Sequence, residues 1–148
     1  MKACEAHYLG DMIYRVVASP EFVTRWLQQG VHREVLKRIP AIIFNDKDMT
    51  LHHNLIALFG LTQDSYPHFF IPSSTAFLDA IHLGLGYGLV PQYQIGNDLK
   101  EGKLIEIIPE AKTHIPLYWH HWKQQPPALA QITQTLLANA TQHLNRRE

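Results

Sequence analysis

Short apolar runs alternate with amphipathic stretches along most of the chain. Runs rich in β-branched and aromatic residues predict strands, and apolar residues at helical spacing predict helices. Because strands and helices alternate, the pattern predicts an α/β fold with a largely parallel sheet. The predicted strands cover 12–18, 41–44, 68–71, 104–108 and 116–122, with a further short strand at the end of 84–91; the predicted helices cover 20–29, 32–38, 49–59, 75–83, 93–100 and 126–144.

The last predicted helix carries an apolar stripe that lacks an obvious partner. If the sheet over residues 41–108 is complete, only the strands at 12–18 and 116–122 are left to pack against this helix. We therefore expect it to belong to a second layer that the chain only partly supplies. The stripe consists of Leu129, Ile132, Leu136, Leu137, Ala140 and Leu144.

Composition excludes several classes of protein. The chain has 148 residues, of which 46% are hydrophobic and 18% charged, which is typical of a globular protein. It has 13 Lys and Arg against 13 Asp and Glu, so it lacks the positive surplus of a nucleic-acid-binding module. The single cysteine, Cys4, excludes a disulfide framework and a cysteine-based zinc site. With no apolar run of membrane length and no signal-peptide pattern, we expect a cytoplasmic protein without a membrane partner.

Motifs for catalysis and metal binding are weak. The glycines of 84–88 follow a helix and lead into a strand, which reverses the order of a dinucleotide-binding loop. The neighbours in His52–His53 and in His120–His121 point in different directions, so neither pair predicts a metal site. Ser73 and Cys4 lack the sequence context of an activated nucleophile. We expect no enzymatic activity, no cofactor and no metal.

Polar residues follow two neighbouring strands of the predicted sheet. Asn45, Asp46 and Asp48 come after the strand at 41–44, and Ser73–Ser74 come after the strand at 68–71. In an open α/β sheet, ligands bind at the carboxyl ends of the strands. Hydroxyls and helix N-terminal amides suit a carboxylate, and aspartates suit an amine, so together they fit an amino acid. Two solvated loops are the alternative interpretation.

Taken in order and with their spacing, several stretches resemble one family. They are similar to the effector-binding domain of LysR-type transcriptional regulators, and most similar to the ArgP (IciA) subgroup, which responds to arginine and lysine. The resemblance covers about residues 4–144. Its matching stretches are 9–14 (LGDMIY), 17–22 (VASPEF), 41–48 (AIIFNDKD) with His52, 73–77 (SSTAF), 88–91 (GLVP), 102–105 (GKLI) and 117–120 (LYWH).

The resemblance implies a periplasmic-binding-protein-like fold with one complete α/β subdomain and a partial second one. Residues 17–116 would form the complete subdomain. Residues 1–16 would be a remnant of the first subdomain with a crossing strand, and residues 117–148 the other crossing strand and a C-terminal helix.

The resemblance also implies an effector site in the cleft between the subdomains. Asp46 and Asp48 are the expected partners of an amine or guanidinium group, and Ser73–Ser74 those of a carboxylate. Asn45 and His52 are further candidates.

The function implied is that of the C-terminal, effector-sensing portion of a LysR-type regulator, which binds a small molecule, a basic amino acid, to modulate transcription. The winged helix-turn-helix of the family is absent from this sequence, so we expect DNA contact only through the parent protein, which is expected to be a homo-oligomer. We therefore expect the chain to be an N-terminally truncated fragment. Two alternatives are a solute-binding protein of the same fold and a non-functional fragment that pairs with the intact regulator.

Overall fold

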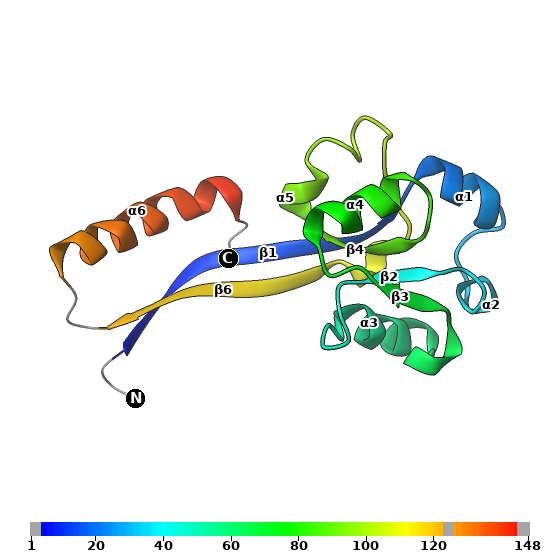
Figure 1. Cartoon of the computed structure of the whole chain (residues 1–148), viewed down its shortest axis with the longest axis horizontal. Helices are drawn as coiled ribbons and strands as arrows, with labels where there is room; N and C mark the ends of the chain where they lie inside the picture. The colour runs from blue at the N-terminus through cyan, green and yellow to red at the C-terminus, as the bar shows by residue number, and fades with distance from the viewer. Residues whose placement is uncertain (1–3, 123–125, 145–148) are drawn as a thin grey trace. The chain divides into compact units, whose positions relative to one another are not determined.

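The structure is a computed structural model that describes residues 4–122 and 126–144, and the chain divides into two compact units. Unit 2 consists of Tyr14–Lys112. Unit 1 consists of the residues before and after it, up to Ile13 and from Thr113 onward. Figure 1 traces the elements of each unit. The subdomain limits expected from the sequence, at residues 17 and 116, stay a prediction.

Unit 2 is built on a mixed sheet. Its strands lie in the order β3-β2-β4-β1-β5, with β2 parallel to β3 and β4, and β1 antiparallel to β4 and β5. The expectation of a largely parallel sheet was therefore wrong for β1. The alternation of strands and helices does not determine the direction of a strand whose neighbours in the sheet are distant in sequence. The strand bounds are β1 Cys4–Ala18, β2 Ala41–Ile43, β3 His68–Phe70, β4 Tyr87–Pro91 and β5 Ile105–Glu106.

Helices cover both faces of this sheet, with α4 and α5 on one face and α3 on the other (Figure 1). Strand β2 explains why both faces are covered, since Ala41 and Ile43 enter one core cluster and Ile42 enters the other. All three are at most 2% exposed, which confirms the prediction of a strand buried on both sides. The helices are α1 Pro20–Trp26, α2 Arg33–Leu36, α3 Thr50–Phe59, α4 Ser74–His82 and α5 Gln92–Ile95, with 3-10 turns at Gln63–Ser65 and Pro109–Ala111.

Helix α5 is shorter than the sequence predicts. A helix was expected over 93–100, but α5 ends at Ile95, and Gly96 follows it with a φ of +55°. A residue at positive φ ends the helical path, and glycine adopts this conformation without a steric penalty. Gly96 is therefore the stop signal that the sequence pattern missed.

The described part of unit 1 contains the first portion of β1, the strand β6 (Thr113–Trp122) paired with it, and the helix α6 (Pro127–His143). Strand β1 begins at Cys4 rather than at residue 12, because pairing with β6 extends it through a segment that is not apolar enough to predict a strand. Trp119 in β6 donates a hydrogen bond from Nε1 to Oγ1 of Thr133 in α6 at 2.8 Å, so this helix packs on β6.

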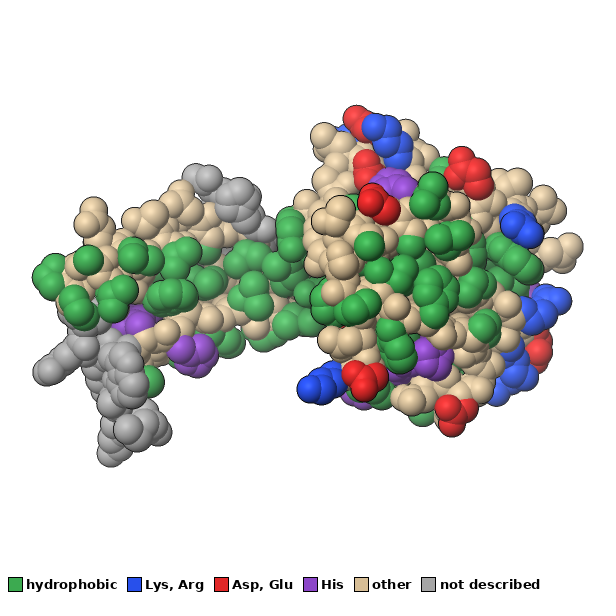
Figure 2. Space-filling view, in the orientation of Figure 1, with side chains coloured by type: hydrophobic (Ala, Val, Ile, Leu, Met, Phe, Trp, Pro, Cys, Tyr) green, Lys and Arg blue, Asp and Glu red, His purple; other side chains and the backbone are tan. Residues whose placement is uncertain are grey.

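The apolar stripe of α6 is only partly covered by the described residues. Ala140 is buried, whereas Leu129, Ile132 and Leu136 are 38–49% exposed. Figure 2 shows hydrophobic side chains along this unit, while charged side chains gather over unit 2. The expectation that this helix belongs to a second layer stays a prediction; within unit 1 the helix packs on β6, and its apolar face is not fully buried. None of the described helices combines the length and the apolar character needed to cross a membrane.

Candidate functional site

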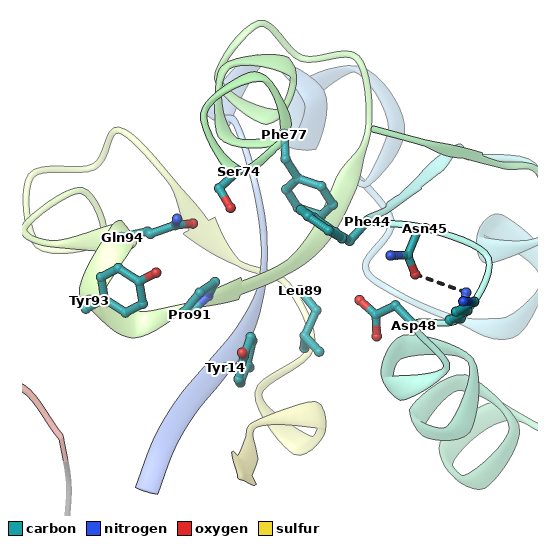
Figure 3. A pocket seen from close by; sticks show the side chains of 11 residues that line it. Tyr14, Phe44, Asn45, Asp48, Ser74, Phe77, Leu89, Pro91, Tyr93 and Gln94 are labelled. Carbon is teal, nitrogen blue, oxygen red and sulfur yellow. Dashed lines mark hydrogen bonds between the residues drawn. The ribbon is translucent and has the colours of Figure 1, made fainter. Parts of the chain in front are cut away.

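Unit 2 contains a cavity of about 420 Å³ at the carboxyl ends of three neighbouring parallel strands, β3, β2 and β4 (Figure 3). This is the position at which open α/β sheets bind ligands. Its volume is within the usual range for small-molecule sites. The lining residues are Tyr14, Phe44, Asn45, Lys47, Asp48, Ser74, Phe77, Leu89, Pro91, Tyr93 and Gln94.

The loop between β2 and α3 supplies the carboxylate of the cavity, Asp48, together with the ammonium group of Lys47 and the amide of Asn45. Asn45 Oδ1 accepts a hydrogen bond from the Lys47 backbone N–H at 3.0 Å, which leaves its amide nitrogen as a donor. Asp48 Oδ1 accepts from the Thr50 backbone N–H at 3.3 Å, at the start of α3. These local bonds hold the loop in a defined conformation and fix the direction of the Asp48 carboxylate, which points into the cavity (Figure 3).

The start of α4 supplies hydrogen-bond donors to another side of the cavity. Ser73 is the N-cap of this helix, and its Oγ accepts from the Ala76 backbone N–H at 3.4 Å. Ser74 is the first helical residue, and its hydroxyl points into the cavity (Figure 3). The first N–H groups of a helix lack intrahelical acceptors and carry the positive end of the helix dipole. This side of the cavity therefore suits a negatively charged group.

Aromatic side chains complete the lining. Tyr93 follows the end of β4, and Tyr14 reaches the same place from β1, where it is paired with Pro91. Burial raises the pKa of Tyr14, and electrostatic interactions with Tyr93 and Asp48 raise it further. The Tyr14 hydroxyl therefore remains protonated near neutral pH and is available as a hydrogen-bond donor beside the Asp48 carboxylate.

The structure brings three of the six residues expected from the sequence to the cavity, namely Asn45, Asp48 and Ser74. The other three are not among the described residues that line it. Asp46 is solvent-exposed in the same loop, and Ser73 caps α4 directly beside Ser74.

His52 lies in the core beneath the loop. It is 6% exposed, and its Nδ1 is hydrogen-bonded to the Tyr66 hydroxyl. Burial lowers the pKa of His52, with a further contribution from the imidazole of His68. Burial also raises the pKa of Tyr66 to about 12. A neutral His52 accepting from a protonated Tyr66 is the arrangement that these directions favour.

Sequence analysis missed the lining residues that follow β4. The rule that selected the loops after β2 and β3 applies equally to Tyr93 and Gln94, because β4 is parallel to β2. The sequence therefore contained a signal for these two residues. It contained none for Tyr14, because its position depends on the antiparallel register of β1 and β4.

A family model and the curated relatives point to the same protein family. The LysR substrate binding domain family matches residues 2–141. The HTH-type transcriptional regulator ArgP of Pseudomonas fluorescens Pf-5 is 40% identical over 136 residues, which are 92% of this chain and 45% of that protein. The chain thus spans under half the length of this curated relative.

Solved structures agree with this match. The C-terminal domains of a LysR family protein from Agrobacterium tumefaciens C58 superpose with a TM-score of 0.89 at 32% identity, covering 99% of this chain and 70% of that one. The full-length regulator LysG of Corynebacterium glutamicum with bound effector Arg has a TM-score of 0.84 at 27% identity, covering 98% and 49%. The expected periplasmic-binding-protein-like α/β fold is confirmed. The chain belongs to the LysR substrate binding domain family.

Proposed function

We propose that this chain is the effector-sensing portion of an ArgP-like LysR-type regulator and that it binds arginine or lysine in the cavity of unit 2. One observation carries this proposal. A carboxylate, Asp48, and a helix start with a hydroxyl, Ser74, face the same cavity of about 420 Å³. An amino acid with a cationic side chain presents the complementary pair of charges.

The lining divides into two polar ends. Asp48 receives the guanidinium or ammonium group, because a carboxylate forms strong charge-assisted hydrogen bonds with such donors. Ser74 and the first N–H groups of α4 receive the α-carboxylate. Ser73 supports this second end by capping the helix.

Apolar side chains suit the methylene stem of the ligand. Phe44, Phe77 and Leu89 line the cavity together with its polar groups. Arginine and lysine both have an apolar stem between two charged ends. The remaining candidates act indirectly: Asp46 adds negative charge to the loop, and His52 packs beneath it.

Two findings on relatives support the choice of ligand class. The LysG structure carries the effector Arg, and the curated relatives at 34–40% identity are ArgP regulators. The alternative of a solute-binding protein for transport is not favoured, since these relatives are transcriptional regulators.

The proposed mechanism is a shift between two conformations of the regulator. A ligand changes such an equilibrium only through its different affinities for the two states. In this role the protein is not an enzyme. It acts in the cytoplasm, because that is the compartment that contains the DNA. DNA contact and homo-oligomer formation belong to the whole regulator. The match to this chain covers only 45% of the curated relative.

Calorimetric titration of the purified chain with L-arginine and L-lysine tests the proposal. L-citrulline is the matched control ligand, because it has nearly the shape of arginine without its side-chain charge. We expect saturable binding of the two cationic amino acids and at least tenfold weaker binding of citrulline. Equal affinity for citrulline, or no binding of either cation, would overturn the proposal.

A further inference from the structure

Three metal-ligating side chains converge in unit 1, outside the cavity described above. Glu5 and His7 lie two residues apart on β1, so they share one face of the strand. His121 comes from β6, which pairs with β1. One ligand atom from each of the three residues lies within 4.8 Å of the other two.

The distances are close to those of a tetrahedral metal site. The two Nε2 atoms are 2.8 Å apart, and Oε2 of Glu5 is 3.6 Å from Nε2 of His7 and 4.0 Å from that of His121. In a tetrahedral zinc site, neighbouring ligand atoms are separated by about 3.3–3.5 Å. The observed distances lie on both sides of this value, so small side-chain movements are sufficient to admit an ion.

We propose that Glu5, His7 and His121 form a binding site for a divalent transition-metal ion of the zinc class. Two imidazole nitrogens and one carboxylate are an established zinc ligand set, and imidazole also suits copper and nickel. The two imidazole rings are nearly parallel, with centroids 4.8 Å apart, and their Nε2 atoms share one hydrogen bond, so a bound ion would take the place of the proton in that bond. Three protein ligands leave a fourth position for water.

The surroundings permit an ion to enter. The side chains of Glu5 and His7 are 45% and 35% exposed, whereas that of His121 is 10% exposed. Cys4 is adjacent to Glu5, and alternation along the strand directs its side chain to the other face. The site therefore contains no thiolate, which favours a borderline ion over a soft one.

This proposal departs from the expectation of no metal site. That expectation considered histidines adjacent in sequence. His7 and His121 are 114 positions apart and meet only because β1 pairs with β6. An ion bound there links the two strands, so its binding energy contributes to the stability of unit 1.

The test is a titration of the full chain, freed of metal by a chelator, with Zn²⁺ in the calorimeter and with Co²⁺ followed by visible absorption. We expect binding of one ion per chain and a Co²⁺ spectrum with the intensity of a tetrahedral site. His7→Gln and His121→Gln should each weaken binding more than about 100-fold, since loss of an outer-shell partner alone costs 10–100-fold.

His120→Gln is the matched control. His120 is an exposed residue of β6 next to His121, and its substitution should leave the titration unchanged. Glu5→Gln serves as a second variant that keeps the shape of the side chain and removes its charge, and it should also weaken binding. Zn²⁺ affinity that is the same in His7→Gln, His121→Gln and the control would overturn the proposal and leave a simple imidazole–imidazole hydrogen bond.

Discussion

Gly88 in β4 lies so close to the ring of Phe77 in α4 that a Cβ atom on Gly88 would be 3.0 Å from Cζ of Phe77. The same Cβ would be 2.9 Å from the carbonyl oxygen of Ile42 in β2. Glycine at this position therefore permits both the close pairing of β4 with β2 and the seating of Phe77 at the cavity wall.

Gly88→Ala should destabilise the chain by about 1–3 kcal/mol, because the added methyl group forces Phe77 and the β2 backbone apart. The measurement is the midpoint of urea unfolding. Phe77→Leu in the Gly88→Ala background should recover part of the loss, which a double-mutant cycle will show. Strictly additive effects of the two substitutions would contradict a direct contact.

The two serine caps should differ in their contributions to stability. Ser19 is 1% exposed and accepts from the Phe22 backbone N–H at 3.1 Å, whereas the Ser73 cap is exposed, with a bond of 3.4 Å. Ser19→Ala should lower the free energy of unfolding by about 1–2 kcal/mol, and Ser73→Ala by less than about 1 kcal/mol. Urea unfolding of both variants checks the order, and equal losses would contradict it.

His52 should make the stability depend on pH. Its pKa is lowered in the folded state, so between the unfolded value of about 6.5 and the folded value the unfolded chain binds more protons. Stability must therefore fall as the pH drops below about 6.5, by at most about 1.4 kcal/mol per pH unit for this group.

His52→Gln should flatten the urea midpoint as a function of pH between about 5 and 7. His120→Gln is the control, because His120 is exposed, lies outside unit 2 and is not among the groups that shift the pKa of His52, so this variant should retain the slope. If both variants keep the slope of the unaltered chain, another group is responsible for it.

Two substitutions measure separately how the two ends of the proposed effector contribute to its binding. Asp48→Asn should weaken arginine binding about 10–100-fold, because hydrogen bonds to charged groups contribute about 1.5–3 kcal/mol. Ser74→Ala should weaken it only about 3–10-fold, since the N–H groups of α4 remain. Calorimetry provides both values.

Asp79→Asn is the matched control for Asp48→Asn, because it removes the same charge from an exposed position on α4 outside the cavity. Its arginine affinity should equal that of the unaltered chain. A comparable loss in Asp79→Asn would indicate that overall charge, and not a contact at Asp48, determines affinity.

Individual elements show which features the local pattern of polar and apolar residues could predict. The apolar run of β2 predicted a strand buried on both faces, and the polar residues after β2 and β3 predicted a ligand edge at which the structure has a cavity. Both inferences depend on residues close in sequence. The contribution of Tyr14 to that cavity and the meeting of His7 with His121 depend on strand pairing over long separations, which local pattern does not encode.

The sequence by itself determined the α/β class, most element positions and which two loops place polar side chains at one edge of the sheet, because side-chain periodicity and strand-to-helix order are local properties of the chain. Only the tertiary structure decided the direction of β1, the extension of that strand to Cys4 and the selection of Asn45, Asp48 and Ser74 from six candidates. These features follow from backbone hydrogen bonding between distant strands and from the direction of individual side chains, and neither is visible in a pattern of polar and apolar positions.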